Sequence, residues 1–374
     1  MIRPGSWLGI LGGGQLGRMF TQAAQAMGYR VVVLDPDRSS PGGRVAEKHL
    51  QAQYDDLDGL GELASISSAV TTEFENVPAD SLRFLSDLLP VSPNAEAVEV
   101  AQDRIREKTF LSNHGFKVAP YAAFNNINDV ITASDDLIFP GLLKASRFGY
   151  DGKGQLLINN RAELRSGFEK LGGVPCVFEQ FLALHLEVSV IVARDKNGDT
   201  SVFPVADNQH CPGIPNLTIS PARISDLLAA KATKMAVSLA EALRYEGILC
   251  VEFFVLKDDV LIINEIAPRP HNSGHFTIDA CNVSQFEQQV RVMCGLPLSK
   301  PIQHVPAVMV NLLGDLWTKG EPDWYRVLQN DCVRLHLYNK DQPRSGRKMG
   351  HLTVVDADLD KALALSKDIK ALLK

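Results

Sequence analysis

The sequence predicts an α/β fold at the N-terminus followed by an α+β region, in two or three domains. Its 374 residues are 45% hydrophobic, 22% charged and 7% aromatic, a globular composition in a chain too long for one compact core. Residues 7–35 follow the order strand, glycine turn, helix, strand. Beyond Pro120 the texture changes to short strands joined by glycine turns, and then to a long helix and a hairpin.

The charge and cysteine content exclude several classes of protein. A net charge of −6 and a pI near 5.9 provide no basic field for nucleic acid or an anionic membrane. The six cysteines form no CxxC pair, which argues against a zinc knuckle or a disulfide framework. No apolar run approaches the ~18 residues that a membrane-spanning helix needs. We therefore expect a cytoplasmic protein with reduced thiols and small-molecule ligands.

The N-terminal unit has apolar runs at residues 7–11 and 31–35, with a helical pattern through Met27 between them. Continuous apolar runs, rather than alternating ones, are typical of a parallel sheet that is covered on both faces. Ser92-Pro93-Asn94 then interrupts the chain, and a charged helix at 101–111 is expected to connect residues 1–102 to the rest.

The remaining chain is expected to hold an α+β domain and a small C-terminal domain. From Pro301 onward the segments are short and strand-like, with a basic turn at 344–348. Before that point we expect strands at 142–145, 155–158, 176–181 and 187–193, a helix at about 224–244 and a hairpin at 247–267.

The first glycine loop fits three interpretations. Gly12, Gly14 and Gly17 match GxGxxG between a strand and a helix, and Asp35 ends the next strand, as in nicotinamide dinucleotide sites. Backbone N–H groups at a helix N-terminus also suit any other phosphate or carboxylate. The third interpretation is a tight turn with no ligand, and the loop alone does not decide between them.

A second glycine loop runs from Lys144 to Gln155 between two expected strands, which is the arrangement of a flap. It lacks the GK[ST] of a Walker loop, but its backbone amides and Lys144 can hold phosphates. The alternative is a basic hairpin with no ligand.

The hairpin at 247–267 carries candidate metal ligands. Counting outward from its turn places Glu252 opposite Glu265 if Val260 joins the loop, and opposite Asn264 if it does not. Facing carboxylates repel unless a cation, a proton or an arginine lies between them, and oxygen ligands suit Mg²⁺ bridged to phosphates. The alternative is a solvated strand edge, which the apolar neighbours in both strands disfavour.

A proline-stiffened turn follows the hairpin and presents Arg269, His271 and His275. The planar guanidinium of Arg269 can bind a phosphate or carboxylate with two parallel hydrogen bonds. For His275, a structural role and a functional one both remain open. No Ser-His-Asp spacing or cysteine-centred nucleophile motif is present.

Taken in order, the motifs resemble the ATP-grasp superfamily and, within it, the 5-(carboxyamino)imidazole ribonucleotide synthases. The resemblance spans nearly the whole chain. It rests on GILGGGQLGRM at 9–19, TTEFENVP at 71–78, DRIREK at 103–108, SRFGYDGKGQ at 146–155, FEQF at 178–181, DNQHCPGI at 207–214, NEIAPRPHNSGH at 264–275 and GRKMGHLT at 346–353.

The resemblance implies three domains. These are a Rossmann-like pre-ATP-grasp α/β domain at 1–102, an ATP-grasp domain at 103–300 and a small β-rich domain at 301–374. Within the ATP-grasp domain it implies a nucleotide flap subdomain at 103–185 and a metal and catalytic subdomain at 186–300. It also implies a homodimer.

The resemblance further implies the residues of each subsite. Metal ligation falls to Glu252 and Glu265, with Mg²⁺ or alternatively Mn²⁺, and the N-terminal loop is assigned to substrate, with no NAD expected. The implied ATP-binding residues are Arg104, Lys144, Gly149, Tyr150, Asp151, Gly152, Lys153, Gly154, Gln155, Glu179, Gln180, Phe181, Leu182, Glu187, His210, Asn264 and Glu265. Those implied for the aminoimidazole ribonucleotide are Gly14, Gln15, Tyr150, Asp151, Lys153, Arg269, His271 and Lys348, of which the last three are also the implied catalytic residues.

Two positions depart from the family pattern. Lys153 stands where many relatives have arginine, and Asp207 stands where glutamate is common.

The implied reaction is the ATP- and bicarbonate-dependent carboxylation of 5-aminoimidazole ribonucleotide through carboxyphosphate, in purine biosynthesis. The alternatives are another ATP-grasp ligase, such as a formate-dependent glycinamide ribonucleotide transformylase or a biotin carboxylase-like component, an NAD-dependent dehydrogenase, and a non-catalytic nucleotide-binding protein. The segments GYDGKGQ, PRPHNSGH and GRKMGH favour the carboxyamino family.

Overall fold

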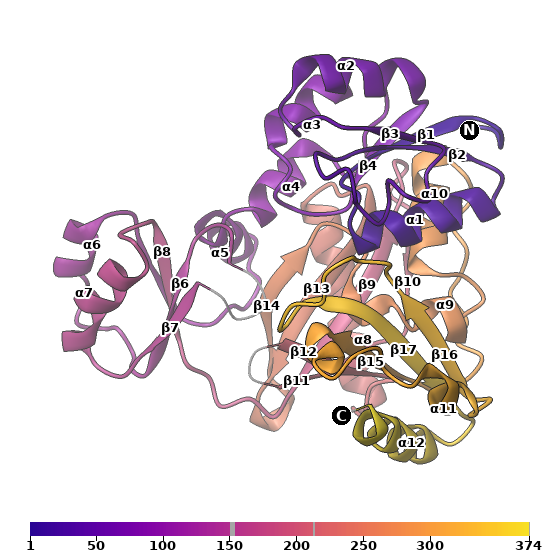
Figure 1. The fold of residues 1–374 in the computed structure, drawn as a ribbon. Helices are drawn as coiled ribbons and strands as arrows, with labels where there is room; N and C mark the ends of the chain where they lie inside the picture. Colours follow the sequence, from indigo (N-terminus) through magenta and orange to yellow (C-terminus); the bar gives the residue numbers. More distant parts are fainter. Residues whose placement is uncertain (150–153, 212–213, 374) are drawn as a thin grey trace.

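The computed structural model describes residues 1–149, 154–211 and 214–373, and within these ranges the strands form three sheets (Figure 1). The N-terminal sheet is parallel, in the order β3-β2-β1-β4, and helices pack on both of its faces. It consists of β1 Trp7–Leu11, β2 Arg30–Leu34, β3 Lys48–Leu50 and β4 Ala69–Thr72, with α1 Gln15–Ala26, α2 Leu57–Ile66, α3 Ala79–Ser86 and α4 Ala95–Ala101. The expected α/β unit is therefore confirmed.

The second sheet is antiparallel and belongs to a unit that lies apart from the other two in Figure 1. Its order is β5-β8-β6-β7, and Phe178 fills its core so closely that a Cβ on Gly141 would meet the ring at 2.2 Å. The elements are β5 Tyr121–Phe124, β6 Gly141–Ala145, β7 Gln155–Ile158 and β8 Cys176–Gln180, with α6 Ile127–Ile131 and α7 Arg161–Lys170.

The third and largest sheet runs in the order β14-β13-β9-β11-β12-β15-β17-β16, with β10 also paired to β9. Apolar residues of α8 pack against β9 and β13 in its core. The strands are β9 Leu186–Arg194, β10 Thr200–Val202, β11 Ala206–Cys211, β12 Ile214–Ser220, β13 Gly247–Val255, β14 Leu261–Ala267, β15 Ala307–Leu313, β16 Val333–Leu337 and β17 Lys348–Val355. The helices are α8 Asp226–Ala242, α9 Thr277–Ala280, α10 Gln285–Cys294, α11 Trp324–Leu328 and α12 Leu359–Leu372.

Two details of the C-terminal region differ from expectation. The strands after Pro301 do not form a sheet of their own, because β15 pairs with β12 and continues the large sheet. A 14-residue helix, α12, then covers these strands, and its buried residues Ala362 and Ile369 explain why it forms there. Sequence analysis found the strands but not this helix.

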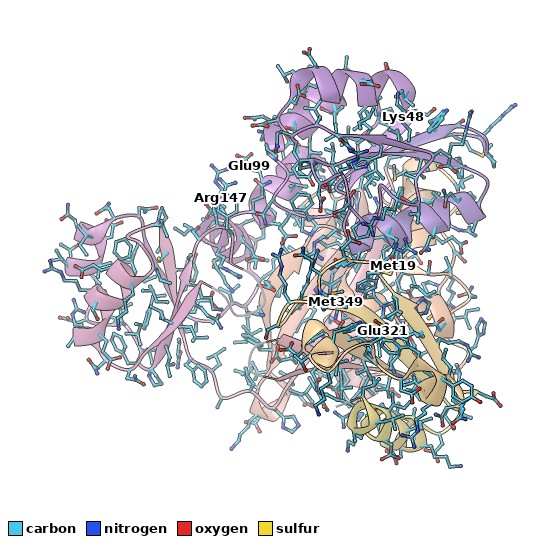
Figure 2. The ribbon with its side chains drawn as sticks, viewed as in Figure 1. Met19, Lys48, Glu99, Arg147, Glu321 and Met349 are labelled. Atoms are coloured by element: carbon cyan, nitrogen blue, oxygen red, sulfur yellow. The ribbon has the colours of Figure 1, made fainter. Side chains whose placement is uncertain are left out.

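The charged helix expected at 101–111 is also shifted. The structure places α5 at Arg104–Asn113, because Asp103 caps it by accepting from the amides of Ile105 and Arg106. Glu99, on α4, is labelled in Figure 2. Its carboxylate accepts from Arg83 and from Arg106, and so ties α3, α4 and α5 together. The helix is therefore firmly oriented, and it also contributes side chains to the central cavity.

The hairpin places Glu252 opposite Glu265, for a reason that sequence counting missed. Val260 does not join the loop in the sense of the count, because the Leu256 amide donates to its carbonyl (2.9 Å) and Val255 pairs with Leu261. This outer register leads towards a pair of Glu252 with Asn264, and a β-bulge then shifts it by one residue. Asn264 is the extra residue, and Glu265 takes its place.

None of the helices in the described part of the chain is both long enough and apolar enough to cross a membrane.

Gln289 on α10 joins the N-terminal unit to the large sheet. Its side chain is 1% exposed, donates to Thr71 Oγ1 (2.9 Å) and accepts from the Ile248 amide (2.8 Å). Gln289→Leu leaves both partners buried without a hydrogen bond, so we expect the free energy of unfolding to fall by about 1–3 kcal/mol, measured by urea unfolding. Gln329→Leu, at an exposed position, is the control, and equal stability of both variants would contradict this assignment.

Candidate active site

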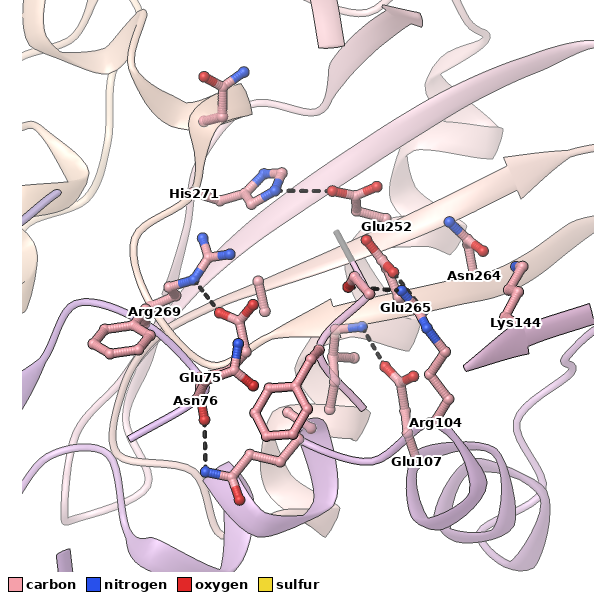
Figure 3. A pocket seen from close by; sticks show the side chains of 18 of the residues that line it. Glu75, Asn76, Arg104, Glu107, Lys144, Glu252, Asn264, Glu265, Arg269 and His271 are labelled. Atoms are coloured by element: carbon pink, nitrogen blue, oxygen red, sulfur yellow. Dashed lines mark hydrogen bonds and ion pairs between the residues drawn. The ribbon is translucent and has the colours of Figure 1, made fainter. Parts of the chain in front are cut away.

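A cavity of about 660 Å³ opens where the three units meet. Its walls come from the N-terminal loop, α5, the β6–β7 hairpin, the ends of β13 and β14, and the start of β17. The residues expected from sequence that line it are Gln15, Arg104, Lys144, Gly149, Gln155, Glu187, Glu252, Asn264, Glu265, Arg269, His271 and Lys348 (Figure 3). Residues distant in sequence are thus brought into one site.

Other expected residues are not part of this wall. Gly14, Gly154 and the segment 179–182 are not among the lining residues that the structure describes, and His210 lies in β11. Tyr150, Asp151, Gly152 and Lys153 lie outside the described residues.

The two expected metal ligands both have cationic or hydrogen-bonding partners. Glu265 Oε2 lies 2.9 Å from Arg104, and Glu252 Oε1 lies 2.9 Å from His271 Nε2 (Figure 3). Burial alone would raise the pKa of the Glu265 carboxyl, but Arg104, with Lys144 and His271, lowers that pKa to about 2. Glu265 is therefore a carboxylate over the whole physiological range, as a ligand for a divalent cation must be.

The oxygen donors at this point fit Mg²⁺. Glu252 and Glu265 face each other in the ladder, and the side chain of Asn264 lies beside them in the cavity wall. Cys250, Glu252 and His271 also offer one ligand atom each within 4.8 Å of one another. A buried thiol is a softer ligand than Mg²⁺ prefers, so the facing carboxylates are the better match for that ion.

A buried cluster of charges lies beside the wall that β6 contributes to the cavity. Lys144 Nζ is 3.1 Å and Lys108 Nζ is 3.5 Å from the same oxygen of Glu179, and all three side chains are at least 90% buried. Desolvation raises the pKa of the Glu179 carboxyl, but the two lysines outweigh it and lower that pKa. The Glu179 side chain thus holds Lys144 in place, a role that sequence analysis did not assign to it.

The opposite end of the cavity is organised by Arg269 and Lys340. Arg269 Nε donates to Glu75 Oε2 (2.7 Å), an ion pair between the loop after β14 and the N-terminal unit (Figure 3). Lys340 Nζ donates to Gln15 Oε1 and to the Lys348 carbonyl, both at 2.7 Å. Glu75 and Lys340 were missed, although Glu75 lies within the TTEFENVP motif.

The N-terminal glycine loop is occupied by carboxylates of the chain itself. The Gly13 amide donates to Asp35 (2.6 Å), and the amides of Gly14 and Gly17 donate to the two oxygens of Glu73. A dinucleotide pyrophosphate at this turn would have to displace both side chains. Asp35 is buried and also accepts from Tyr54 (2.8 Å), so these contacts argue against the nicotinamide interpretation of the loop.

His275 is a buried structural histidine at the base of the cavity. It is 1% exposed, its Nδ1 lies 3.2 Å from the Gln285 amide nitrogen, and its ring lies 4.8 Å from that of His351. Burial, together with nearby positive groups, lowers its pKa well below the usual value, so the ring is neutral. Of its two open roles, the contacts favour the structural one.

The low pKa of Glu265 makes a prediction about stability. The pKa of the Glu265 carboxyl is about 2 in the folded state, and its ordinary value is 4.5. The charged carboxylate therefore stabilises the fold above pH 4.5, and this contribution is lost as the pH falls from 4.5 towards 2. Urea unfolding between pH 6 and pH 3 should therefore show a shallower pH dependence in Glu265→Gln than in the wild type. The exposed Glu241→Gln is the control, and a wild-type slope in Glu265→Gln would contradict the assignment.

Comparisons with known proteins show which family the chain resembles along its length. Three family models match in sequence: a ribonucleotide synthetase preATP-grasp domain at residues 6–102, an ATP-grasp domain at 109–286 and a phosphoribosylaminoimidazole carboxylase C-terminal domain at 307–365.

Similar proteins match over almost the full length. The N5-carboxyaminoimidazole ribonucleotide synthase of Bacillus subtilis is 42% identical over 96% of this chain and 94% of its own. The Staphylococcus aureus N5-carboxyaminoimidazole synthetase, solved with ADP, has a TM-score of 0.91 at 38% identity and covers 100% of this chain and 98% of its own. The Aspergillus clavatus enzyme, solved with ADP and 5-aminoimidazole ribonucleotide, has a TM-score of 0.88 at 28% identity, covering 99% and 98%. This chain belongs to the N5-carboxyaminoimidazole ribonucleotide synthase family of ATP-grasp proteins.

Proposed function

We infer that this chain is an ADP-forming ligase that uses ATP and bicarbonate to carboxylate the amine of 5-aminoimidazole ribonucleotide, in purine biosynthesis. One observation carries the inference. The facing Glu252 and Glu265 share a cavity with the phosphate-binding cations Arg104 and Lys144 at one end and with Arg269, His271 and Lys348 at the other. The Aspergillus clavatus relative has been solved in complex with both ADP and 5-aminoimidazole ribonucleotide, the two kinds of ligand for which these two ends are proposed.

The nucleotide end is suited to bind the triphosphate of ATP. Lys144 is held by Glu179, and Arg104 is held by Glu265, so both cations are positioned before the nucleotide arrives. Glu252 and Glu265 would hold Mg²⁺, or alternatively Mn²⁺. When bound, that ion offsets the negative charge that spreads over the transferring phosphoryl group.

The chemistry divides into two steps. A bicarbonate oxygen attacks the γ-phosphorus, and the bond from that phosphorus to the β-γ bridging oxygen breaks, which releases ADP and forms carboxyphosphate. The substrate amine then attacks the carboxyl carbon, directly or through CO₂ released beside it. The carbon–oxygen bond breaks, phosphate leaves, and the amine loses a proton.

The chain's own residues orient this reaction. Arg269 presents a planar donor fork whose direction is set by Glu75, and His271 Nδ1 is oriented by Ser273 at 2.9 Å. Lys348 adds a third cationic group to the same wall. The segment 149–155, part of which is described, is proposed to close over the site and exclude water from the labile carboxyphosphate.

Several features of this proposal stay predictions. They are the homodimer, the cytoplasmic location, the domain boundaries at residues 102, 185 and 300, and the roles of individual site residues.

The proposed function is tested by ADP release from Mg-ATP and bicarbonate, with and without 5-aminoimidazole ribonucleotide. Because carboxyphosphate is productive only when the amine captures its carboxyl group, we expect release to depend strongly on this ribonucleotide. Glycinamide ribonucleotide with formate is the control pair, and this pair should not support ADP release in place of 5-aminoimidazole ribonucleotide and bicarbonate. Turnover with formate and glycinamide ribonucleotide instead would keep the ATP-grasp chemistry and overturn the substrate.

Glu265→Gln tests the metal pair. The amide keeps the size of the side chain but removes a negative ligand, so we expect ADP release to fall on the order of 100-fold, with circular dichroism unchanged. Glu241→Gln, on the exposed surface of α8, should release ADP at the wild-type rate. Wild-type release by Glu265→Gln would contradict the metal assignment.

A further inference from the structure

The β-bulge at Asn264 decides where the Glu265 carboxylate points. Without it, the register of the outer half of the hairpin would continue, and Glu265 would lie opposite Val251. Because strand side chains alternate between faces, Glu265 would then turn towards the face on which Val251 is fully buried in the apolar core. Its position beside Glu252 therefore depends on one extra residue in β14.

Three side chains from one face of α5 bind the three consecutive residues at this bulge. Lys108 Nζ donates to the Asn264 carbonyl (2.7 Å), and the Ile266 amide donates to Glu107 Oε1 (2.6 Å). Arg104 donates to the carboxylate of Glu265, which lies between Asn264 and Ile266 (2.9 Å). Arg104, Glu107 and Lys108 have the spacing i, i+3, i+4, which places them side by side on a helix.

These contacts satisfy backbone groups that no strand reaches. β14 lies at the end of the strand order in the large sheet, and an isolated bridge joins Val118 to Ile263 on its outer edge. Beyond the bulge, this edge has no ladder partner among the described residues. Lys108 is 1% and Glu107 is 2% exposed, and buried polar side chains are retained where hydrogen bonds compensate their desolvation. The pair of side chains binds the bulge on both sides of Glu265.

α5 is itself anchored to the second unit. Ser146, at the end of β6, accepts from the Arg104 amide (2.9 Å) through its carbonyl and donates to Asp103 (2.5 Å) through its hydroxyl. The position of the bulge is therefore tied to the end of the strand that carries Lys144.

We propose that Glu107 and Lys108 are positioning residues, which hold the Asn264 bulge so that Glu265 faces Glu252 and the pair can bind one divalent cation. The proposal rests on the proposed function for the cation, but the clamp itself is a property of the metal-free protein. Lys108 acts through the Asn264 carbonyl, and Glu107, which also lines the cavity, acts through the Ile266 amide.

The test compares Lys108→Met with Lys117→Met. Both remove an ammonium group from a side chain of similar length. Lys117 is exposed, and its hydrogen bond to β14 comes from its backbone carbonyl, which accepts from the Ile263 amide and is kept in the variant. The first readout is amide hydrogen exchange of residues 262–267 in the metal-free protein. The second is Mn²⁺ affinity in the presence of ADP, and the third is the KM for Mg-ATP.

We expect Lys108→Met to exchange the β14 amides faster, to bind Mn²⁺ about tenfold or more weakly and to raise the KM for Mg-ATP. Lys117→Met should match the wild type in all three readouts. Lys108→Arg keeps a charged donor and should restore most of the protection. A wild-type exchange rate in Lys108→Met would overturn the proposal that Glu107 and Lys108 hold the bulge. Faster exchange with unchanged Mn²⁺ affinity would keep that part of the proposal, but it would overturn the assignment of Glu252 and Glu265 as the metal pair.

If Lys108→Met does not fold, Glu107→Gln and Glu107→Ala provide the same comparison at the other side of the bulge. Glu107→Gln keeps an acceptor for the Ile266 amide and should retain protection, whereas Glu107→Ala should lose it. Equal exchange in these two variants would also overturn the clamp.

Discussion

Glu252 and Glu265 face each other across the β13–β14 ladder, where two negative charges repel unless positive groups lie near them. In the described structure those groups are His271 beside one carboxylate and Arg104 beside the other. Under the proposed function, a divalent cation with a bound triphosphate would add charge of both signs to the same place. The arrangement of the cavity follows from the need to balance these charges in a partly buried site.

This balance requires side chains from different units of the fold. Arg104 comes from α5, Lys144 from the small antiparallel sheet, and Glu265 from the edge of the large one. Ion pairs and buried hydrogen bonds join the units around the site, among them Arg269 with Glu75 and Gln289 with Thr71. The site therefore forms only when the units are assembled, and preorganised charges of this kind stabilise a transition state without moving during the reaction.

Much of the fold and part of the site could be predicted from the sequence. The βαβ unit and the hairpin were visible because apolar runs and turn residues are local signals. The positions of Arg104, Lys144 and Arg269 in one cavity came from the family resemblance, because no local pattern brings residues so far apart together. The bulge at Asn264 was not found, because β14 begins with the continuous apolar run Leu261–Ile263 and so has no clear alternation whose break would mark an inserted residue.

The residues that support the site were also missed. Glu73, Glu75, Glu107, Lys108 and Lys340 are charged residues in polar segments, and from sequence they are indistinguishable from solvated ones. Only tertiary structure shows that Lys108 is buried and that Glu73 fills the glycine loop. The loop also shows why the GxGxxG motif alone does not identify a dinucleotide site. Here the turn matches the motif, but its amides bind carboxylates of the chain itself.

The central claim is that the cavity transfers the γ-phosphoryl group of ATP to bicarbonate before the amine is carboxylated. The most direct measurement is mass analysis of the phosphate released with ¹⁸O-labelled bicarbonate, ATP and 5-aminoimidazole ribonucleotide. Attack by a bicarbonate oxygen leaves that oxygen on phosphorus when the carbon–oxygen bond breaks, so each phosphate should carry one labelled oxygen. Phosphate without the label would mean that water attacks the phosphorus, and it would contradict the account.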